Sequence, residues 1–211
     1  MEKVTGDGDR LLGYRLSLKG KRLLKEQSPN QDVSLSRRGY KTQFEHDQKL
    51  IDVRRILEKS PLIGGFKMDH ELRAEIADGK NRPSNWQTAQ LIPDAVFVQR
   101  TPKQSMKIAL ELELTQKSKR RYGRIFRAHL LAKKWNLTLY LVKDEALRKS
   151  LMETLEEVKR KDLEVRLAKV VNGIYFCSLE DFLLKGLEAP MTNGKREISF
   201  AEMARRIESG S

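Results

Sequence analysis

The chain is poor in the residues that carry most metal and redox chemistry. Its 211 residues include one cysteine and three histidines, and no apolar run approaches the roughly 20 residues that a membrane helix needs. The single thiol of Cys177 excludes an internal disulfide and a cysteine-based zinc site, and its apolar neighbours predict a core thiol. The histidines lack metal-ligand spacing of the HExxH kind, and no Walker loop, dinucleotide fingerprint or nucleophile elbow is present.

The composition is that of a highly charged, water-soluble protein. Apolar residues make up 39% of the chain and charged residues 34%. The length suffices for one α/β domain with a small appendage. Because the N-terminal residues do not have the pattern of a signal peptide, we expect a cytoplasmic protein that has no contact with membranes.

The positive charge of the chain is concentrated in one region. Of a net charge of +13, nine charges arise between Gln99 and Lys134, where eleven lysines and arginines accompany two glutamates. A polyanion is the natural partner for such a field, so we expect DNA binding. A membrane surface fits less well, because the basic helix expected here has an apolar face suited to a protein core. RNA binding or docking of a partner protein is a further alternative.

Hydrophobic periodicity predicts alternating helices and strands. We expect helices over residues 43–59, 69–78, 117–135 and 144–161, and strands over 61–68, 91–98, 107–115 and 137–142. One or two further strands are predicted between 165 and 177, with short helices from 178 and 199. This interleaving predicts a layered α/β domain with αβββαβ order. The predicted divisions are a hairpin region 1–26, a linker 27–42, the α/β domain 43–187 and a polar tail with a short helix 188–211.

The first 26 residues resemble part of a winged-helix DNA-binding domain. Leu11 to Ser17 alternates like a hairpin strand, and Leu18 to Leu24 begins a helical pattern. This order is similar to the wing and closing helix of that domain, without the helices that should precede them. Either the reading frame begins inside a longer ancestral protein, or the match is due to chance and the segment is a small basic hairpin.

Three acids mark the two central apolar strands. Glu111 and Glu113 should share one face of their strand, with Leu110 and Leu112 on the other, and Asp94 lies in the preceding strand. Carboxylates among buried leucines are unfavourable unless they bind a cation, so the pattern predicts a divalent-metal site. The alternative is that both glutamates form the solvated face of an edge strand, and that Asp94 belongs to a turn.

Pro93-Asp94, followed by Glu111-Leu112-Glu113 on the next strand, resembles the core motif of PD-(D/E)XK nucleases. In that family the third motif residue is usually lysine, whereas this chain has Glu113, as in the Glu-x-Glu version of some type II restriction enzymes. In an alternative register, Glu113-Leu114-Thr115 is the motif and Lys117 reaches back as the cation. A narrower resemblance is to plasmid replication-relaxation proteins, which pair a winged-helix region with Pro-Asp, an acidic strand and a basic helix.

The resemblance implies a restriction-endonuclease-like αβββαβ core and assigns roles to particular residues. Asp94 and Glu111 would bind Mg²⁺ or Mn²⁺, and Glu113 would bind a second metal or act as general base. Lys117 would supply positive charge at the reacting phosphate. Phosphate contacts are predicted for three residues of the basic helix: Arg120, Arg121 and Arg124. Outside this set, Glu45 and His46 are weaker candidates on the leading helix, and His129 is expected to be a core residue.

The leading hypothesis is therefore a metal-dependent DNA endonuclease or nickase that serves plasmid or mobile-element replication, or restriction. The alternative is a catalytically inactive DNA-binding module of the same fold that acts in replication or transfer control. Cutting both strands of a duplex would require a homodimer, which no residue pattern demonstrates.

Overall fold

The structure is a computed structural model in which two compact units are distinguished, Met1–Lys49 and Leu50–Ser211. It describes the backbone of residues 2–5, 11–15, 41–77, 91–132, 134–167 and 173–209, and the side chains of those that lie between 43 and 206. In these ranges no helix is both long and apolar enough to cross a membrane.

The first unit contains a two-stranded antiparallel sheet. Strand β1 (Glu2–Thr5) pairs with β2 (Leu11–Arg15), which confirms a hairpin strand where the alternation predicted one. The predicted helix start at 18–24 lies outside the described residues, as does the predicted linker up to residue 40. Helix α2 (Lys41–Glu58) begins in this unit and ends in the second. The winged-helix resemblance of this region stays a prediction.

The second unit is a mixed α/β structure built on a sheet with the order β3-β4-β5-β6-β7-β8-β9. The three strands β5, β6 and β7 are parallel, and the remaining neighbours are antiparallel. The predicted α/β class is thereby confirmed. The strands are β3 (Ile63–Met68), β4 (Ala95–Arg100), β5 (Ser105–Glu113), β6 (Leu137–Val142), β7 (Gly173–Ser178), β8 (Met191–Thr192) and β9 (Glu197–Ile198).

The helices of this unit begin where the sequence offers a capping side chain. Ser118, Asp144 and Ser178 each accept a hydrogen bond from the backbone N–H three residues later. After α2, the described helices are α3 (Asp69–Ala77), α5 (Lys119–Leu131), α6 (Glu145–Lys161), α7 (Leu163–Leu167), α8 (Leu179–Lys185), the 3₁₀ turn η2 (Gly186–Glu188) and α9 (Phe200–Ser209).

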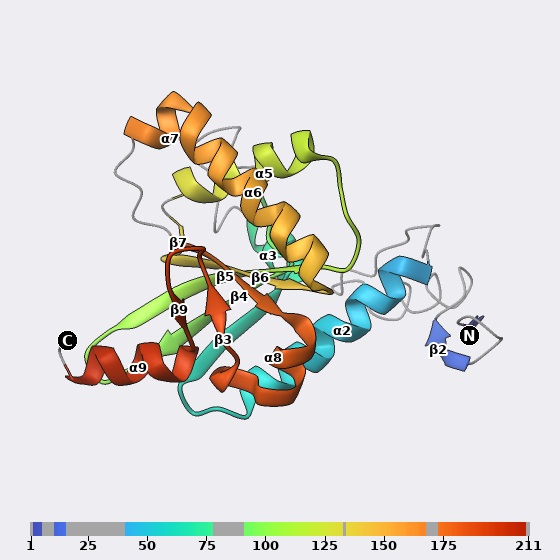
Figure 1. Cartoon of the computed structure of the whole chain (residues 1–211). Coiled ribbons are helices and arrows are strands. Elements are labelled where there is room, and N and C mark those ends of the chain that lie inside the picture. The colour runs from blue at the N-terminus through green and yellow to red at the C-terminus, as the bar shows by residue number, and fades with distance from the viewer. Residues whose placement is uncertain are drawn as a thin grey trace. The chain divides into compact units, whose positions relative to one another are not determined.

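Apolar side chains fill both faces of the sheet. On one face, the later part of α2, together with α8 and α9, covers a cluster that includes Phe97, Leu110 and Leu112. On the other face, α5, α6 and α7 cover a cluster around Tyr140 and Phe176, and Figure 1 shows these three helices on one side of the sheet. Each fully buried side chain of this size contributes about 1.5–3 kcal/mol to stability, so both layers hold the sheet in place.

Two segments differ from the sequence prediction. Residues 188–209, expected as a polar tail with a short helix, contain that helix but also add β8 and β9 to the sheet. Their apolar side chains Met191, Ile198 and Phe200 are buried in the core, and Gln99 Nε2 donates to the Phe200 carbonyl at 2.9 Å. Residues 163–167, part of which was predicted as strand, form the short helix α7 instead.

Candidate functional site

The three predicted acids lie on one face of the sheet, where β4 begins and β5 ends. Leu110 and Leu112 are buried in the core opposite, so the alternation predicted for Glu111 and Glu113 is confirmed. Because β4 runs antiparallel to β5 and Ala95 pairs with Leu110, Asp94 lies opposite Glu111 at the end of the ladder. The Asp94 carboxylate accepts a hydrogen bond from the backbone N–H of Leu112 at 2.8 Å, which fixes it against β5.

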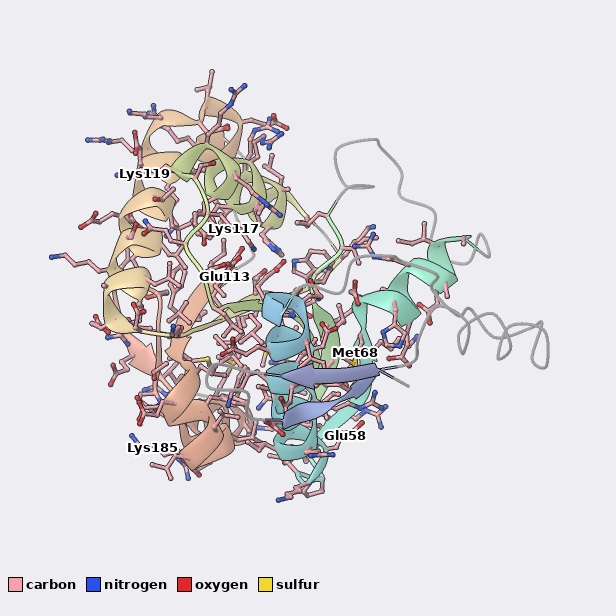
Figure 2. All side chains as sticks on the ribbon, turned by 90° about the vertical axis from the view of Figure 1, so that its right-hand side faces the viewer. Glu58, Met68, Glu113, Lys117, Lys119 and Lys185 are labelled. Atoms are coloured by element: carbon pink, nitrogen blue, oxygen red, sulfur yellow. The ribbon has the colours of Figure 1, made fainter. Side chains whose placement is uncertain are left out.

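Glu113 is the most enclosed of the acids, with 2% of its surface exposed. Its Oε1 lies 2.5 Å from Lys117 Nζ, and its Oε2 lies 3.2 Å from the Tyr122 hydroxyl. Burial raises the pKa of the Glu113 carboxyl, while the bond to Lys117 opposes that rise. Figure 2 shows Lys117 next to Glu113. The structure thus brings Lys117 back to the acidic strand, as the alternative motif register predicted.

Tyr122 of α5 holds the segment between the acidic strand and the helix. Its hydroxyl accepts from the backbone N–H of Lys117 at 3.0 Å and lies within donating distance of Glu113 and the Thr115 carbonyl. Burial raises the pKa of Tyr122 to about 12, so the phenol remains a neutral donor at neutral pH. The Tyr122 hydroxyl therefore holds both members of the Glu113–Lys117 pair in position.

Glu111 is held by a buried histidine of α5. His129 is fully buried, its Nε2 lies 2.9 Å from Glu111 Oε1, and its Nδ1 lies 3.1 Å from Thr138 Oγ1. Burial lowers the pKa of His129 to about 3, so the ring is neutral at pH 7 and has a single N–H. In the tautomer with its proton on Nε2, the ring donates a hydrogen bond to the Glu111 carboxylate, and Nδ1 accepts one from the Thr138 hydroxyl. His129 is buried as expected, but it is also part of the site.

Tyr140 is a further group of the site that sequence reasoning missed. It pairs in register with Glu111 on the neighbouring parallel strand, and it is fully buried. Its hydroxyl has no hydrogen-bond partner among the described residues. Burial and then the charges of Glu111, Glu113 and Asp94 raise the pKa of this phenol well above 10. The only signal in the sequence was a hydroxyl within an apolar strand, next to that of Thr138 two positions earlier.

The acids do not form a ready-made cage of three ligands. Within the part of the chain that the structure describes, no group of three or more His, Cys, Asp or Glu side chains is arranged to hold a metal ion. Both oxygens of Glu113 have protein partners, so a cation at this site would be bound by Asp94 and Glu111, each of which also has a hydrogen-bond partner in the protein. Such a pair fits Mg²⁺, which keeps several waters and commonly takes one or two protein carboxylates.

The first turns of α5 present a cationic surface beside this site. Arg120, Arg121 and Arg124 are exposed, and none of the three forms an ion pair with another described residue. Arg127, one turn later, differs because it binds Asp162 at 2.8 Å and also contacts Glu164. The three arginines predicted to bind phosphate are therefore not neutralised by an acid within the part of the chain that the structure describes.

Comparison with protein-family models, with curated proteins and with solved structures finds no match for this chain. Of the weaker candidates, Glu45 and His46 belong to the first unit, where His46 Nδ1 lies 3.5 Å from Asp47 Oδ1. The site consists of residues of the second unit.

Proposed function

We propose that the second unit is a metal-dependent nuclease that hydrolyses phosphodiester bonds in DNA. One observation carries the proposal. Asp94, Glu111 and Glu113 lie on one face of the sheet where β4 begins and β5 ends, directly before a helix whose exposed arginines have no acidic partner among the described residues. A cation between carboxylates and a basic surface for the nucleic-acid backbone are the two parts that such chemistry requires.

In the proposed mechanism Asp94 and Glu111 would hold Mg²⁺ or Mn²⁺. A bound divalent cation supplies Lewis-acid stabilisation of the phosphoryl oxygens and lowers the pKa of a coordinated water. The chain itself fixes both ligands, Asp94 through the Leu112 N–H and Glu111 through His129. Lys117, held beside the site by Glu113, supplies the positive charge that the expected motif lysine would otherwise provide.

The order of elements supports a restriction-endonuclease-like core. Helix α2 is followed by β3, β4, β5, α5 and β6, with α3 inserted between β3 and β4, in keeping with the expected αβββαβ pattern. The hairpin of β1 and β2 belongs to the region that resembles a winged helix, which is why the proposal includes the resemblance to plasmid replication-relaxation proteins. A role in plasmid or mobile-element replication, or in restriction, belongs to the same proposal, as does a homodimer for cuts through both strands.

The test is conversion of supercoiled plasmid to nicked circles in Mg²⁺ or Mn²⁺. Asp94→Asn and Glu111→Gln keep the shape of each side chain but remove a cation ligand, so both should abolish nicking. Glu180→Gln, an exposed residue of α8, serves as the matched control and should retain it. Nicking that persists in EDTA or in Asp94→Asn would rule out hydrolysis at this site.

A second candidate is a DNA-binding module of the same fold without catalysis. The specific observation in its favour is Glu113, whose two oxygens are both engaged and which thus offers no free base for an attacking water. This candidate requires that the wild type and Asp94→Asn bind DNA equally and that neither nicks it. A parallel binding titration with RNA of the same length distinguishes the nucleic acids.

A further inference from the structure

The hydroxyl of Tyr140 lies in an unusual position for a buried phenol. Buried tyrosines normally find a hydrogen-bond partner, because a desolvated donor without one is unfavourable. Here the residue is fully buried, and its hydroxyl has no partner in the described part of the structure. It nevertheless lies close enough to Asp94, Glu111 and Glu113 for their charges to act on it.

The ring of Tyr140 cannot turn its hydroxyl elsewhere. Phe126 and Phe176 pack against it with ring centroids 5.4 Å away in each case, and His129 packs edge-on at 5.9 Å. Its place in the middle of β6, opposite Glu111 on β5, fixes the backbone as well. A phenylalanine would fill the same aromatic cluster. The hydroxyl is therefore the feature that packing does not explain.

Resting on the function proposed above, we infer that Tyr140 contacts the ligand of this site. Its hydroxyl forms a hydrogen bond with a water molecule in the coordination shell of a divalent cation held by Asp94 and Glu111. Mg²⁺ and Mn²⁺ retain such waters when two carboxylates bind them. A neutral phenol suits this place, because it accepts a hydrogen bond from the polarised water and still has its own proton to donate. Tyr140 thereby makes an outer-shell contact that positions the water.

The test compares three tyrosine-to-phenylalanine variants. Without divalent cations, Tyr140→Phe should keep or raise the melting temperature, because the hydroxyl that it removes has no partner. Tyr122→Phe should lower the melting temperature, because its hydroxyl bonds the segment around Lys117. In calorimetric titration with Mn²⁺, Tyr140→Phe should weaken binding about three- to tenfold, the effect of one hydrogen bond. Tyr175→Phe, whose ring packs on the opposite face of the sheet, should bind Mn²⁺ as the wild type does.

The outcomes separate this inference from the proposed function. Wild-type protein that binds Mn²⁺ with the same affinity as Tyr140→Phe would overturn the role of Tyr140 and leave the cation site intact. A clear loss of melting temperature in cation-free Tyr140→Phe would overturn it too, since the hydroxyl would then have a partner in the free protein. Wild-type protein that binds no Mn²⁺ would overturn the cation site and the role of Tyr140 with it.

Discussion

Glu113 shows how a single buried carboxylate depends on its neighbours. A carboxylate with 2% of its surface exposed loses most of its hydration, and Lys117 and Tyr122 offset this loss. Because the pKa of Glu113 is raised in the folded protein, the Glu113 carboxylate binds a proton more readily there than in the unfolded chain. Its contribution to stability is therefore complete below the unfolded pKa and declines as the pH rises through the folded one.

Replacing Lys117 by alanine should expose this dependence. The change leaves the Glu113 charge uncompensated, so the free energy of unfolding should fall by roughly 1–3 kcal/mol at pH 8. At pH 4 the loss should be smaller, because a protonated Glu113 needs no cation. Urea denaturation at both pH values measures the two losses. In a Glu113→Gln background the Lys117→Ala change should have little effect, and an equal loss there would contradict the coupling.

His129 has the opposite pH dependence. Its folded pKa of about 3 lies below the ordinary value of 6.5, so the unfolded chain takes up its proton first. The stability that the neutral ring provides is complete above pH 6.5 and is lost as the pH falls toward 3. The wild type should lose on the order of 3–5 kcal/mol across this window through His129. In His129→Gln that part of the slope should vanish, as urea titrations in EDTA at stepped pH would show; an unchanged slope would assign it to other groups.

The acids of the site were predictable from the sequence, whereas their supports were not. Alternation along a strand is a local rule, so it placed Glu111 and Glu113 on one face before any tertiary contact was known. His129 and Tyr140 also sit where an apolar residue would serve. Only the register of β6 beside β5 and the packing of α5 bring them to the carboxylates. Long-range contacts of this kind leave no periodic trace in the chain.

At the scale of elements, the ends of the helices and strands agreed with the sequence where a capping residue or an apolar run marked them. The basic helix was expected over 117–135 and forms over Lys119–Leu131, where the Ser118 side chain caps its start. Its predicted C-terminal end was too late, because no glycine or proline marks it. Strand β6 forms over the same residues, 137–142, that its apolar run predicted. The two-residue strands β8 and β9 were missed because such short segments have no periodicity of their own.

Two glycines in this framework should respond oppositely to alanine. A Cβ on Gly123, in the middle of α5, would meet Val158 at an ordinary 3.8 Å, so Gly123→Ala should add about 0.5–1 kcal/mol of stability through helix propensity. A Cβ on Gly173 would come within 2.7 Å of the buried Tyr175 ring, so Gly173→Ala should destabilise β7. Thermal unfolding of both variants gives the comparison. Destabilisation by Gly123→Ala would mean that α5 and α6 pack more tightly than described.

At the scale of the whole molecule, the part of the net charge of +13 that is available to a polyanion is carried by cations without acidic partners. Among the described residues Arg120, Arg121 and Arg124 are such a group, whereas Arg127 is neutralised by Asp162 and Glu164. Composition predicted the polyanion partner, but only the structure separates these two kinds of arginine.

Replacing Arg120, Arg121 and Arg124 together by alanine should therefore weaken DNA binding and its salt dependence. If each contacts one phosphate, the slope of log affinity against log salt should become shallower by about 2–3. Arg127→Ala should leave that slope unchanged and lower stability instead, because it leaves two acids without their cation. Fluorescence anisotropy at several salt concentrations provides both slopes. Equal slopes for the triple variant and the wild type would place the DNA contact elsewhere.

The last two strands determine where the chain can be truncated without loss of folding. Strand β8 pairs with the edge of β7 that would otherwise be unpaired. The side chains of Met191, Ile198 and Phe200 are buried in the core next to it. A fragment that stops near residue 187 would expose both the unpaired backbone edge of β7 and the apolar core surface. Such an exposed edge promotes edge-to-edge association of strands and aggregation. A fragment of the α/β unit for crystallisation or fusion should therefore extend through Ala204, and a shorter fragment should aggregate into inclusion bodies.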